Sequence, residues 1–265
     1  MPKIRFSKYH GTGNDFVIIE DLDNKINLNQ AQIASICSRR FGVGADGLML
    51  LRKKSGYDFE MVYFNSDGYE STMCGNGGRC IVAFAKAMGV IKNHTTFIAI
   101  DGEHNASISN NGLVSLGMVN VEKVKALSND FSFELFTGSP HYVSFTDDNI
   151  FKMDDFIEKS KSIRFGAQYH SEGINVNQAK KLAENHLQMR TYERGVENET
   201  YSCGTGAVAA AIAFHFKYCR QRTSNTIKID TLGGQLNVSF SATDIFSNIV
   251  LTGPAKFVFN GEISI

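Results

Sequence analysis

The sequence has little proline, no excess of charge of either sign and no long apolar run. Only 3 of its 265 residues are proline, against 24 glycines, which indicates an ordered chain with many tight turns. Its 27 basic and 27 acidic residues balance, so we expect neither a nucleic-acid nor a membrane-surface partner. The longest apolar run, about 207–214, falls far short of the roughly 20 residues that span a bilayer. Since the N-terminal stretch also lacks a signal-peptide pattern, we predict a cytoplasmic protein.

The five cysteines are spaced neither as a disulfide framework nor as a metal site. Their number is odd, their spacing is irregular, and no Cys-x-x-Cys pair occurs. The histidines do not cluster with them at zinc-ligand spacing, so we expect no structural metal. A cytoplasmic chain also keeps its thiols reduced. The five are Cys37, Cys74, Cys80, Cys203 and Cys219.

Two of these cysteines stand in nearly the same local sequence, one in each half of the chain. The two segments are Glu70-Ser-Thr-Met-Cys74-Gly-Asn-Gly-Gly and Glu199-Thr-Tyr-Ser-Cys203-Gly-Thr-Gly-Ala. Both have a glutamate four residues before the cysteine, then Cys-Gly-x-Gly, then small and apolar residues typical of a helix. A methionine-containing strand precedes each cysteine at nearly the same distance. These shared offsets indicate an internal repeat.

The hydrophobic pattern predicts strands and helices in both halves. Alternating or β-branched runs predict strands at Lys3–Phe6, Phe16–Ile19, Tyr57–Phe64, Thr95–Ile100, Leu113–Val119, His141–Phe145, Leu187–Glu193, Thr226–Ile229, Gln235–Phe240 and Lys256–Phe259. Helical periodicity predicts helices at Asn29–Arg40, Gly78–Met88, Lys152–Ser162 and Thr205–Tyr218. The second and fourth are apolar on nearly all faces, as buried helices are. We therefore predict an α+β fold of two pseudo-symmetric domains, each a curled sheet or barrel around one central helix.

The repeated cysteine motif is suited to acid–base chemistry. A thiol at a helix start meets unpaired N–H groups and the positive end of the helix dipole, and both favour the thiolate. The glycines after Cys74 and Cys203 let the same N–H groups approach a carboxylate. If two such sulfurs face one carbon, one can remove a proton while the other returns one, which inverts the centre. A lone cysteine is more often a small core residue, and we keep that interpretation for Cys37, Cys80 and Cys219.

Eight motifs across nearly the whole chain resemble those of the diaminopimelate epimerase family. They are His10-Gly-Thr-Gly-Asn-Asp-Phe16, Gly42-Val-Gly-Ala-Asp-Gly47, Phe64-Asn-Ser-Asp-Gly68, Met73-Cys-Gly-Asn-Gly-Gly-Arg-Cys80, Pro140-His141, Asn175-Val-Asn177, Tyr192-Glu-Arg-Gly195 and Cys203-Gly-Thr-Gly206. The resemblance implies a cofactor-independent epimerase that interconverts LL- and meso-2,6-diaminopimelate for lysine and peptidoglycan synthesis. It also implies that Cys74 and Cys203 are the two catalytic acid–base residues.

The resemblance further implies a domain organisation and an assembly. One domain would comprise residues 1–117 plus 254–265 and carry Cys74, because the last strand, near 257–265, returns to it. The other would comprise residues 118–253 and carry Cys203. The active site would lie in the cleft between them, and the protein would form a homodimer, as family members commonly do.

Polar residues near the two cysteines are candidates for holding the substrate. By resemblance, substrate would be bound by the side chains of Asn14, Asn65, Asn175, Glu193 and Arg194 and by the backbone N–H groups of Gly75, Asn76, Gly204 and Thr205. His141 and Glu193 would tune the ionisation of the thiols. Without the resemblance, the asparagines are equally good turn formers, His141 could be a buried structural residue, and the Glu-Arg doublet would be a solvated surface ion pair.

Three positions depart from the family pattern. Ser139 stands where asparagine is frequent, and its shorter hydroxyl leaves substrate contact there open. Arg40 replaces a frequent histidine with no clear consequence. Phe259 replaces a tyrosine that lies near the dimer contact of some relatives, so one hydrogen bond between subunits would be missing.

Two alternatives remain at this point. The first is another two-cysteine amino-acid racemase of the same fold, for example one acting on proline-type substrates. The second, from a different class, is a thiol redox or sensor protein in which the two cysteines form a regulatory disulfide. Residues suited to a long, doubly zwitterionic substrate favour diaminopimelate over the first, and exchange of a substrate α-hydrogen with solvent would exclude the second.

Overall fold

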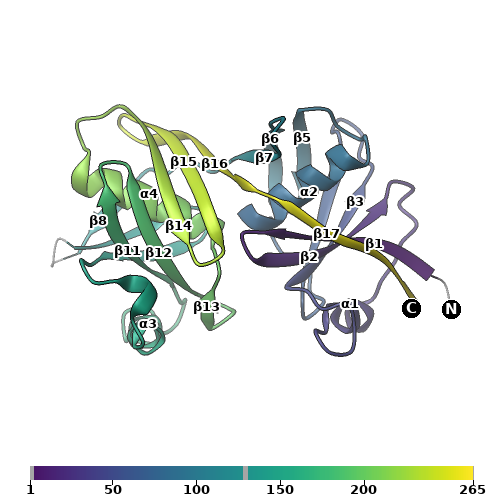
Figure 1. The fold of residues 1–265 in the computed structure, drawn as a ribbon, viewed down its shortest axis with the longest axis horizontal. Coiled ribbons are helices and arrows are strands. Elements are labelled where there is room, and N and C mark those ends of the chain that lie inside the picture. Colours follow the sequence, from purple (N-terminus) through teal and green to yellow (C-terminus); the bar gives the residue numbers. More distant parts are fainter. Residues whose placement is uncertain (1–2, 128–130, 265) are drawn as a thin grey trace. The chain divides into compact units, whose positions relative to one another are not determined.

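The computed structural model describes residues 3–127 and 131–264 of the chain. It divides into two units, each with its own core (Figure 1). Unit 1 comprises Met1–Leu116 and Gly253–Ile265, and unit 2 comprises Gly117–Thr252. Within the described residues each unit combines one mixed sheet with two α-helices, so the predicted α+β class is confirmed.

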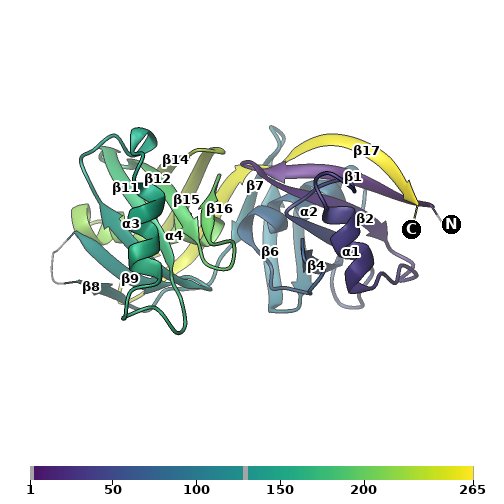
Figure 2. The same cartoon turned by 90° about the horizontal axis from the view of Figure 1, so that it is seen from below.

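Unit 1 is built on a sheet with the strand order β17-β1-β2-β3-β4-β5-β6-β7. Its elements are β1 (Lys3–Gly11), β2 (Asn14–Asp21), α1 (Gln30–Cys37), β3 (Gly47–Arg52), β4 (Glu60–Asn65), α2 (Gly75–Ala87), β5 (His94–Ala99), β6 (Gly102–Ile108), β7 (Leu113–Gly117) and β17 (Lys256–Ser264). Strand β17 pairs with β1, with Lys3 opposite Ser264, so the two ends of the chain lie side by side (Figure 2).

Unit 2 has a sheet with the order β8-β9-β10-β11-β12-β14-β15-β16, and β13 also pairs with β12. Its elements are β8 (Val124–Ala126), β9 (Ser132–Phe136), β10 (Pro140–Phe145), a 3-10 turn (Ile150–Lys152), α3 (Phe156–Arg164), β11 (Asn175–Ala183), β12 (His186–Glu193), β13 (Asn198–Thr200), α4 (Gly204–Tyr218), β14 (Ser224–Thr231), β15 (Gly234–Ala242) and β16 (Phe246–Pro254).

The two units repeat the same topology. From β1 to β7 the successive pairings are antiparallel, parallel, antiparallel, parallel, antiparallel and antiparallel. The series β9, β10, β11, β12, β14, β15 and β16 repeats that pattern step by step. Helices α1 and α3 follow the second strand of each series, while α2 and α4 lie between the fourth and fifth. The repeat predicted from the cysteine motifs therefore extends through both units.

Each unit wraps its sheet around one helix that carries a cysteine at its start. Helix α4 packs on β9, β10, β11, β12, β14 and β15, and its residues from Ala207 to Phe214 are completely buried. Helix α2 packs on β1, β2, β3 and β6 of its own unit. The small side chains of α4 allow strands to approach it from several sides, which explains why so apolar a helix is stable here.

The predicted helices are all present, but their starts differ. Helix α1 begins after Asn29, whose side chain accepts a hydrogen bond from the backbone of Gln32 in a capping box. Helix α2 begins at Gly75 rather than Gly78, directly after Cys74, and is followed by Gly89 at φ +74°. Helix α3 begins at Phe156 because residues 150–152 form a separate 3-10 turn.

Candidate active site

Cys74 is the N-cap residue of α2. Its backbone is extended (φ −101°, ψ 148°), and its Sγ accepts a hydrogen bond from the backbone N–H of Gly77 at 3.2 Å. The backbone N–H groups of Gly75 and Asn76 belong to the same first turn, and both residues are buried. This is the arrangement that stabilises a thiolate, because helix N–H groups and the helix dipole act on the sulfur together.

Two asparagines predicted to bind substrate lie at one end of the sheet near Cys74. Asn76 Nδ2 donates to Asn14 Oδ1 at 3.3 Å, and Asn14 Nδ2 donates to Asp46 at 2.7 Å. Strand register places Asn65 opposite Gly47, and Gly47 opposite Phe16, two residues after Asn14. Asn65 therefore ends β4 at the sheet edge where β2 begins. The structure thus gathers Cys74, Asn76, Asn14 and Asn65 in unit 1.

Cys203 occupies the equivalent N-cap position of α4. Its Sγ accepts from the backbone N–H of Gly206 at 3.4 Å and lies 3.4 Å from Thr205 Oγ1. A side chain at position 206 would not fit, because a Cβ there would stand 2.6 Å from Asn177 Oδ1 and 3.2 Å from the Cβ of Cys203. The glycine required by the motif thus permits close packing of α4 against β11.

A chain of hydrogen bonds leads from the core of unit 2 to the sulfur of Cys203. The hydroxyl of Thr191 donates to Asn177 Oδ1 at 2.9 Å, which fixes the amide so that Nδ2 donates to His141 Nδ1 at 3.0 Å. The ring proton is therefore on Nε2, which lies 3.0 Å from Thr205 Oγ1. That hydroxyl lies 3.3 Å from Ser139 Oγ and 3.4 Å from Cys203 Sγ, so it links His141 to both.

The other predicted residues of unit 2 surround this chain. Asn175 Nδ2 donates to Ser139 Oγ at 3.3 Å and to Pro140 O at 3.0 Å, while its Oδ1 accepts from the backbone N–H of Arg194 at 2.9 Å. Ser139 Oγ also lies 2.9 Å from His141 Nε2. Glu193 is the last residue of β12, and Arg194 starts the turn after it, so a strand end brings the doublet to one place as the sequence predicts.

Ser139 therefore has a definite place despite its departure from the family pattern. Its hydroxyl contacts His141 and Asn175 and lies 3.3 Å from Thr205 Oγ1. These are contacts within the protein, so the shorter side chain supports the hydrogen-bonded chain that ends at Cys203.

His141 is completely buried and uncharged. Burial, together with the positive charge of Arg194, lowers the pKa of its imidazole to about 3. Both ring nitrogens have hydrogen-bond partners that suit the neutral form. At neutral pH His141 therefore orients the hydroxyl groups of Ser139 and Thr205 near Cys203 without adding a positive charge of its own.

We expect His141 to make the protein less stable in mild acid. The folded state holds its pKa near 3, whereas the unfolded chain protonates near pH 6.5, so stability is complete above pH 6.5 and falls as pH drops toward 3. The loss attributable to this residue is about 2 kcal/mol at pH 5. Urea unfolding at pH 7 and pH 5 measures it. His141→Gln should lack this part of the pH dependence, and His94→Gln, at an exposed position of β5, should retain it. Equal slopes for His141→Gln and the unaltered protein would contradict the assignment.

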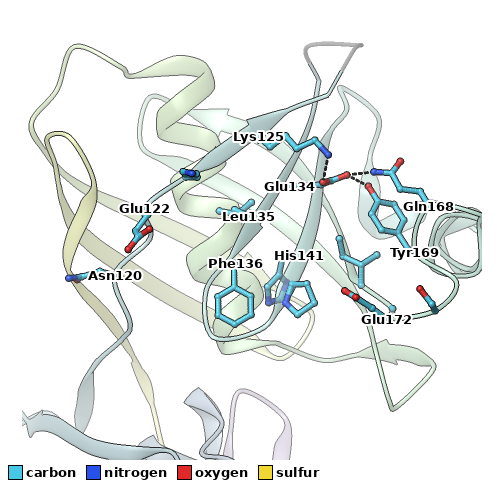
Figure 3. Close-up of a pocket in the computed structure, with 15 residues that line it drawn as sticks. Asn120, Glu122, Lys125, Glu134, Leu135, Phe136, His141, Gln168, Tyr169 and Glu172 are labelled. Carbon is cyan, nitrogen blue, oxygen red and sulfur yellow. Dashed lines mark hydrogen bonds and ion pairs between the residues drawn. The ribbon is translucent and has the colours of Figure 1, made fainter.

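A hollow of about 800 Å³ lies beside the unit 2 residues (Figure 3). Pro140 and His141 form part of its wall, and Cys203 is not among the residues that line it. On its far side Glu134 accepts hydrogen bonds from Lys125 at 2.7 Å, from Gln168 and from Tyr169. That carboxylate is therefore satisfied by hydrogen bonds within the protein.

The part of the chain that the structure describes has neither a cluster of metal ligands nor a membrane-spanning helix. No three His, Cys, Asp or Glu side chains among residues 3–127 and 131–264 are grouped as a metal site. None of the described helices is long and apolar enough to cross a membrane.

Comparison with known proteins identifies the family. The family model described as diaminopimelate epimerase matches residues 6–124 and 133–258. The chain belongs to the diaminopimelate epimerase family. It is 51% identical over 265 residues to a diaminopimelate epimerase of Flavobacterium psychrophilum, covering 98% of this chain and 100% of that protein. It is 39% identical to one of Methanocella arvoryzae, covering 100% and 98%. As a member of this family, the chain is an isomerase.

Solved structures of low sequence identity share the fold of this epimerase family. A PhzF-family phenazine biosynthesis protein of Bacillus anthracis has a TM-score of 0.75 at 16% identity, with both chains fully covered. A hydroxyproline epimerase of Agrobacterium vitis has a TM-score of 0.65 at 13% identity, covering 98% of this chain and 92% of that one. The prediction of two similar halves, each with a sheet curled around a central helix, is confirmed.

Sequence analysis did not single out three residues that the structure places beside the cysteines. Asn177 and Thr191 orient His141 from β11 and β12, and Arg79 lies buried in α2. Asn177 had a detectable signal, since it stands two residues after Asn175 and alternation puts both on one face of a strand. Thr191 had none, and the burial of Arg79 could not be foreseen because it also involves Thr12 and Pro254 from distant parts of the sequence.

Proposed function

We propose that this protein interconverts LL- and meso-2,6-diaminopimelate by a two-base mechanism in which Cys74 and Cys203 exchange protons with one α-carbon. The observation that carries the proposal is the repeated cysteine at the N-cap of α2 and α4, each sulfur accepting a helix N–H, at 3.2 and 3.4 Å. The names of its relatives supply the substrate.

The mechanism needs one thiolate and one thiol. The thiolate removes the α-proton from one face of the substrate carbon while the opposite thiol delivers a proton to the other face, so the centre is inverted and the two sulfurs exchange protonation states. Negative charge that spreads into the α-carboxylate is stabilised by the backbone N–H groups of Gly75, Asn76, Gly204 and Thr205 at the two helix starts. The reaction requires no pyridoxal phosphate and no metal.

Both half-sites must act on one substrate molecule for this to occur. We therefore propose that residues 1–117 with 254–265, and residues 118–253, hold the substrate in common. The reacting carbon would be served by the matched elements, the two cysteines and the two helix starts. The amino-acid end that does not react would be held by the unmatched polar residues, Asn14, Asn65, Asn175, Glu193 and Arg194.

Arg194 is the candidate for binding the distal carboxylate. Its side chain is exposed, and within residues 3–127 and 131–264 its guanidinium makes one hydrogen bond, from Nη1 to the backbone oxygen of Glu172 at 2.9 Å, so a planar fork of donors is available for a carboxylate. Arg194→Met should lower kcat/KM at least about tenfold, mainly through a higher KM, because uniform binding is lost. Arg194→Lys should retain part of the affinity. Arg222→Met removes an exposed arginine paired with Glu184 and should leave both constants unchanged. An unaltered KM in Arg194→Met would remove this residue from the substrate site.

The wider setting of the enzyme follows from its family and remains proposed. The product would enter lysine synthesis and peptidoglycan cross-links, and the protein would work in the cytoplasm. We also propose a homodimer, because Phe257, Val258 and Phe259 leave β17 with exposed apolar side chains. Light scattering should then give twice the chain mass of 29.3 kDa.

The direct test of the function is conversion of pure LL-diaminopimelate to the meso form by the reduced protein. We expect turnover in the presence of EDTA and with no pyridoxal phosphate added, followed by chiral chromatography. Proline and hydroxyproline serve as competing substrates, and inversion of these alone would favour a different racemase of the same fold. A folded, reduced protein that inverts none of them would contradict the epimerase function and favour a redox role for the two thiols.

A further inference from the structure

Arg79 carries a charge that is buried beside the N-terminus of α2. The side chain is 0% exposed and stands five residues after Cys74, one turn into the helix. Its Nη1 donates to Gly75 O at 3.0 Å, and its Nη2 donates to Asn76 Oδ1 at 2.9 Å and to Thr12 Oγ1 at 3.2 Å. Nε reaches Pro254 O at 3.5 Å. Every one of these acceptors is neutral.

In this respect Arg79 differs from three other basic residues that are buried or half-buried. Lys8 pairs with Asp15 at 2.7 Å, Arg52 with Asp21 at 2.7 Å, and Arg190 with Glu199 through two hydrogen bonds. Arg79, in contrast, forms no ion pair within 4 Å with any carboxylate of residues 3–127 and 131–264. A buried cation without a counter-ion costs several kcal/mol, so such a group is retained where an anion forms beside it.

The anions available to Arg79 are thiolates. The Arg79 guanidinium donates to the backbone oxygen of Gly75, the residue after Cys74, and Cys80 is the next residue along the chain, so both thiols lie close to it. Burial lowers the pKa of Arg79, and charge on Cys80 or Cys74 acts in the opposite direction. Cys80 is completely buried, and desolvation raises the pKa of its thiol so far that it stays protonated. Cys74 is half-buried and accepts a helix N–H. Cys74 is therefore the neighbour that can carry the compensating charge.

The better buried charged groups on elements packed against α2 are paired with each other. On β1 and β2, Lys8 and Asp15 pair with each other, and Arg39 pairs with Asp15 at 2.8 Å. On β3, Arg52 is held by Asp21, and on β6, His104 contacts Asp101 at 3.3 Å. Tyr9 on β1 has a pKa raised by burial and stays neutral. None of these groups replaces Arg79 as the local positive charge or neutralises it.

The internal repeat supplies a comparison within the same chain. When Cys74 is aligned with Cys203, Arg79 falls on Val208, which is also 0% exposed. Both cysteines have the same helix start, but unit 2 has a buried valine where unit 1 has a buried cation. His141, the titratable group linked to Cys203, is neutral, and Arg194 is exposed to solvent, which screens its charge. The two thiols therefore stand in electrostatically different surroundings.

We propose that Arg79 is the counter-charge that makes Cys74, rather than Cys203, the thiolate of the free enzyme. This rests on the two-thiol function proposed above, and it breaks the symmetry of that mechanism. In the free enzyme Cys74 is then the base that accepts a proton, and Cys203 is the acid that donates one. Arg79 acts through Cys74 and touches no substrate, so it is a positioning residue. Gly11 packs closely against the same turn, since a Cβ there would stand 3.0 Å from Asn76 O and 3.2 Å from Arg79 Nη2.

The test measures thiol ionisation without any substrate. The rate of alkylation by iodoacetamide is measured for each cysteine at a series of pH values, and the labelled peptides are identified by mass. Cys74 is followed in the Cys203→Ala variant and Cys203 in the Cys74→Ala variant, so that the two titrations are not coupled. We expect the midpoint for Cys74 to lie at least one pH unit below that for Cys203. Adding Arg79→Met should raise the Cys74 midpoint by one pH unit or more and leave the Cys203 midpoint unchanged. Alkylation of Cys74 at neutral pH should then be about tenfold slower.

Two further variants separate charge from structure. Arg79→Lys keeps the charge and should restore most of the lower Cys74 midpoint. Arg52→Met removes a guanidinium of the same unit that has its own carboxylate and should shift neither midpoint. A purely structural role for Arg79 predicts that its methionine and lysine variants behave alike. If Arg79→Met does not fold, as judged by circular dichroism, the comparison of Cys74 with Cys203 still decides.

The outcomes also separate this inference from the proposed function. A Cys203 midpoint equal to or lower than that of Cys74 overturns the inference, as does a folded Arg79→Met variant with an unchanged Cys74 midpoint. Epimerisation of diaminopimelate with either of these results would leave the function intact and remove Arg79 from it. If the Cys74 midpoint is low and depends on Arg79 but the protein has no epimerase activity, the inference stands and the proposed function is contradicted.

Discussion

Replacing either Cys74 or Cys203 by alanine is expected to lower the rate of epimerisation by about a thousandfold or more. General acid–base catalysis by one positioned side chain contributes about 10²- to 10⁴-fold, and inversion needs both groups at once. Chiral chromatography of the product from LL-diaminopimelate measures the loss. Because each sulfur caps a helix through a single N–H, its removal should cost only about 1 kcal/mol of stability, and circular dichroism should show an intact fold.

Cys219→Ala is the matched control for this experiment. Cys219 lies at the C-terminal end of α4, half-exposed, with its Sγ 3.6 Å from Glu184 O, so it is far along the helix from Cys203. Its replacement should leave turnover unchanged. A tenth or more of the normal activity in Cys74→Ala or Cys203→Ala would show that the missing thiol is not an essential acid or base.

The second large effect is expected from Asn177→Leu. Asn177 is completely buried and makes three hydrogen bonds, with Thr191 Oγ1, His141 Nδ1 and Tyr142 O. Leucine has a similar size but leaves three buried polar groups unsatisfied, each of which costs about 1–3 kcal/mol. We therefore expect a loss of about 3–5 kcal/mol in the free energy of unfolding, measured with urea. Activity should fall as well, because His141 loses the contact that fixes its tautomer.

Asn237→Leu controls for the substitution itself. Asn237 is on β15, is partly exposed, and makes no side-chain hydrogen bond within residues 3–127 and 131–264. The same change there should alter stability by less than about 0.5 kcal/mol. If Asn177→Leu were equally mild, the hydrogen-bonded chain leading to Cys203 would not be a significant part of the fold.

Much of the architecture could be predicted from the sequence because local patterns and the fold agree. Each predicted strand overlaps an observed one, and the capping of α1 by Asn29 follows directly from its sequence. The error at the start of α2 has a physical cause. Gly75 and Gly77 have low helix propensity, yet they are helical because Cys74 caps the turn and the glycines permit close packing.

Two of the strands that the sequence did not predict, β3 and β11, lie where the alternating pattern fails. Strand β3, with the apolar run from Leu48 to Leu51, is buried on both faces and therefore does not alternate. Strand β11 begins with the buried polar residues Asn175 and Asn177, which disguise a core strand as a loop. The two buried asparagines at the start of β11 lie at the candidate site, since both take part in the hydrogen bonds around His141.

The residue types of the candidate site could be proposed from the sequence, but the buried contacts of Arg79 and His141 could not. The cysteine motifs were recognisable because the whole motif is local. The burial of Arg79 depends on Thr12 and Pro254, which lie 67 and 175 residues away in the sequence, so an arginine in a helix gave no sign that it was buried. The neutral state of His141 likewise depends on its burial among strands from separate parts of the chain.

In the proposed mechanism two thiols act on opposite faces of one carbon, and deuterium incorporation tests this most directly. LL-diaminopimelate is converted in heavy water, and both isomers are examined by mass spectrometry before one tenth has reacted. We predict that the meso product carries one deuterium at its inverted α-carbon while the remaining LL substrate carries almost none, because the proton is removed by one sulfur and supplied by the other. Meso product that retains the original hydrogen, or LL substrate labelled as fast as product forms, would indicate a single base and contradict the two-thiol mechanism.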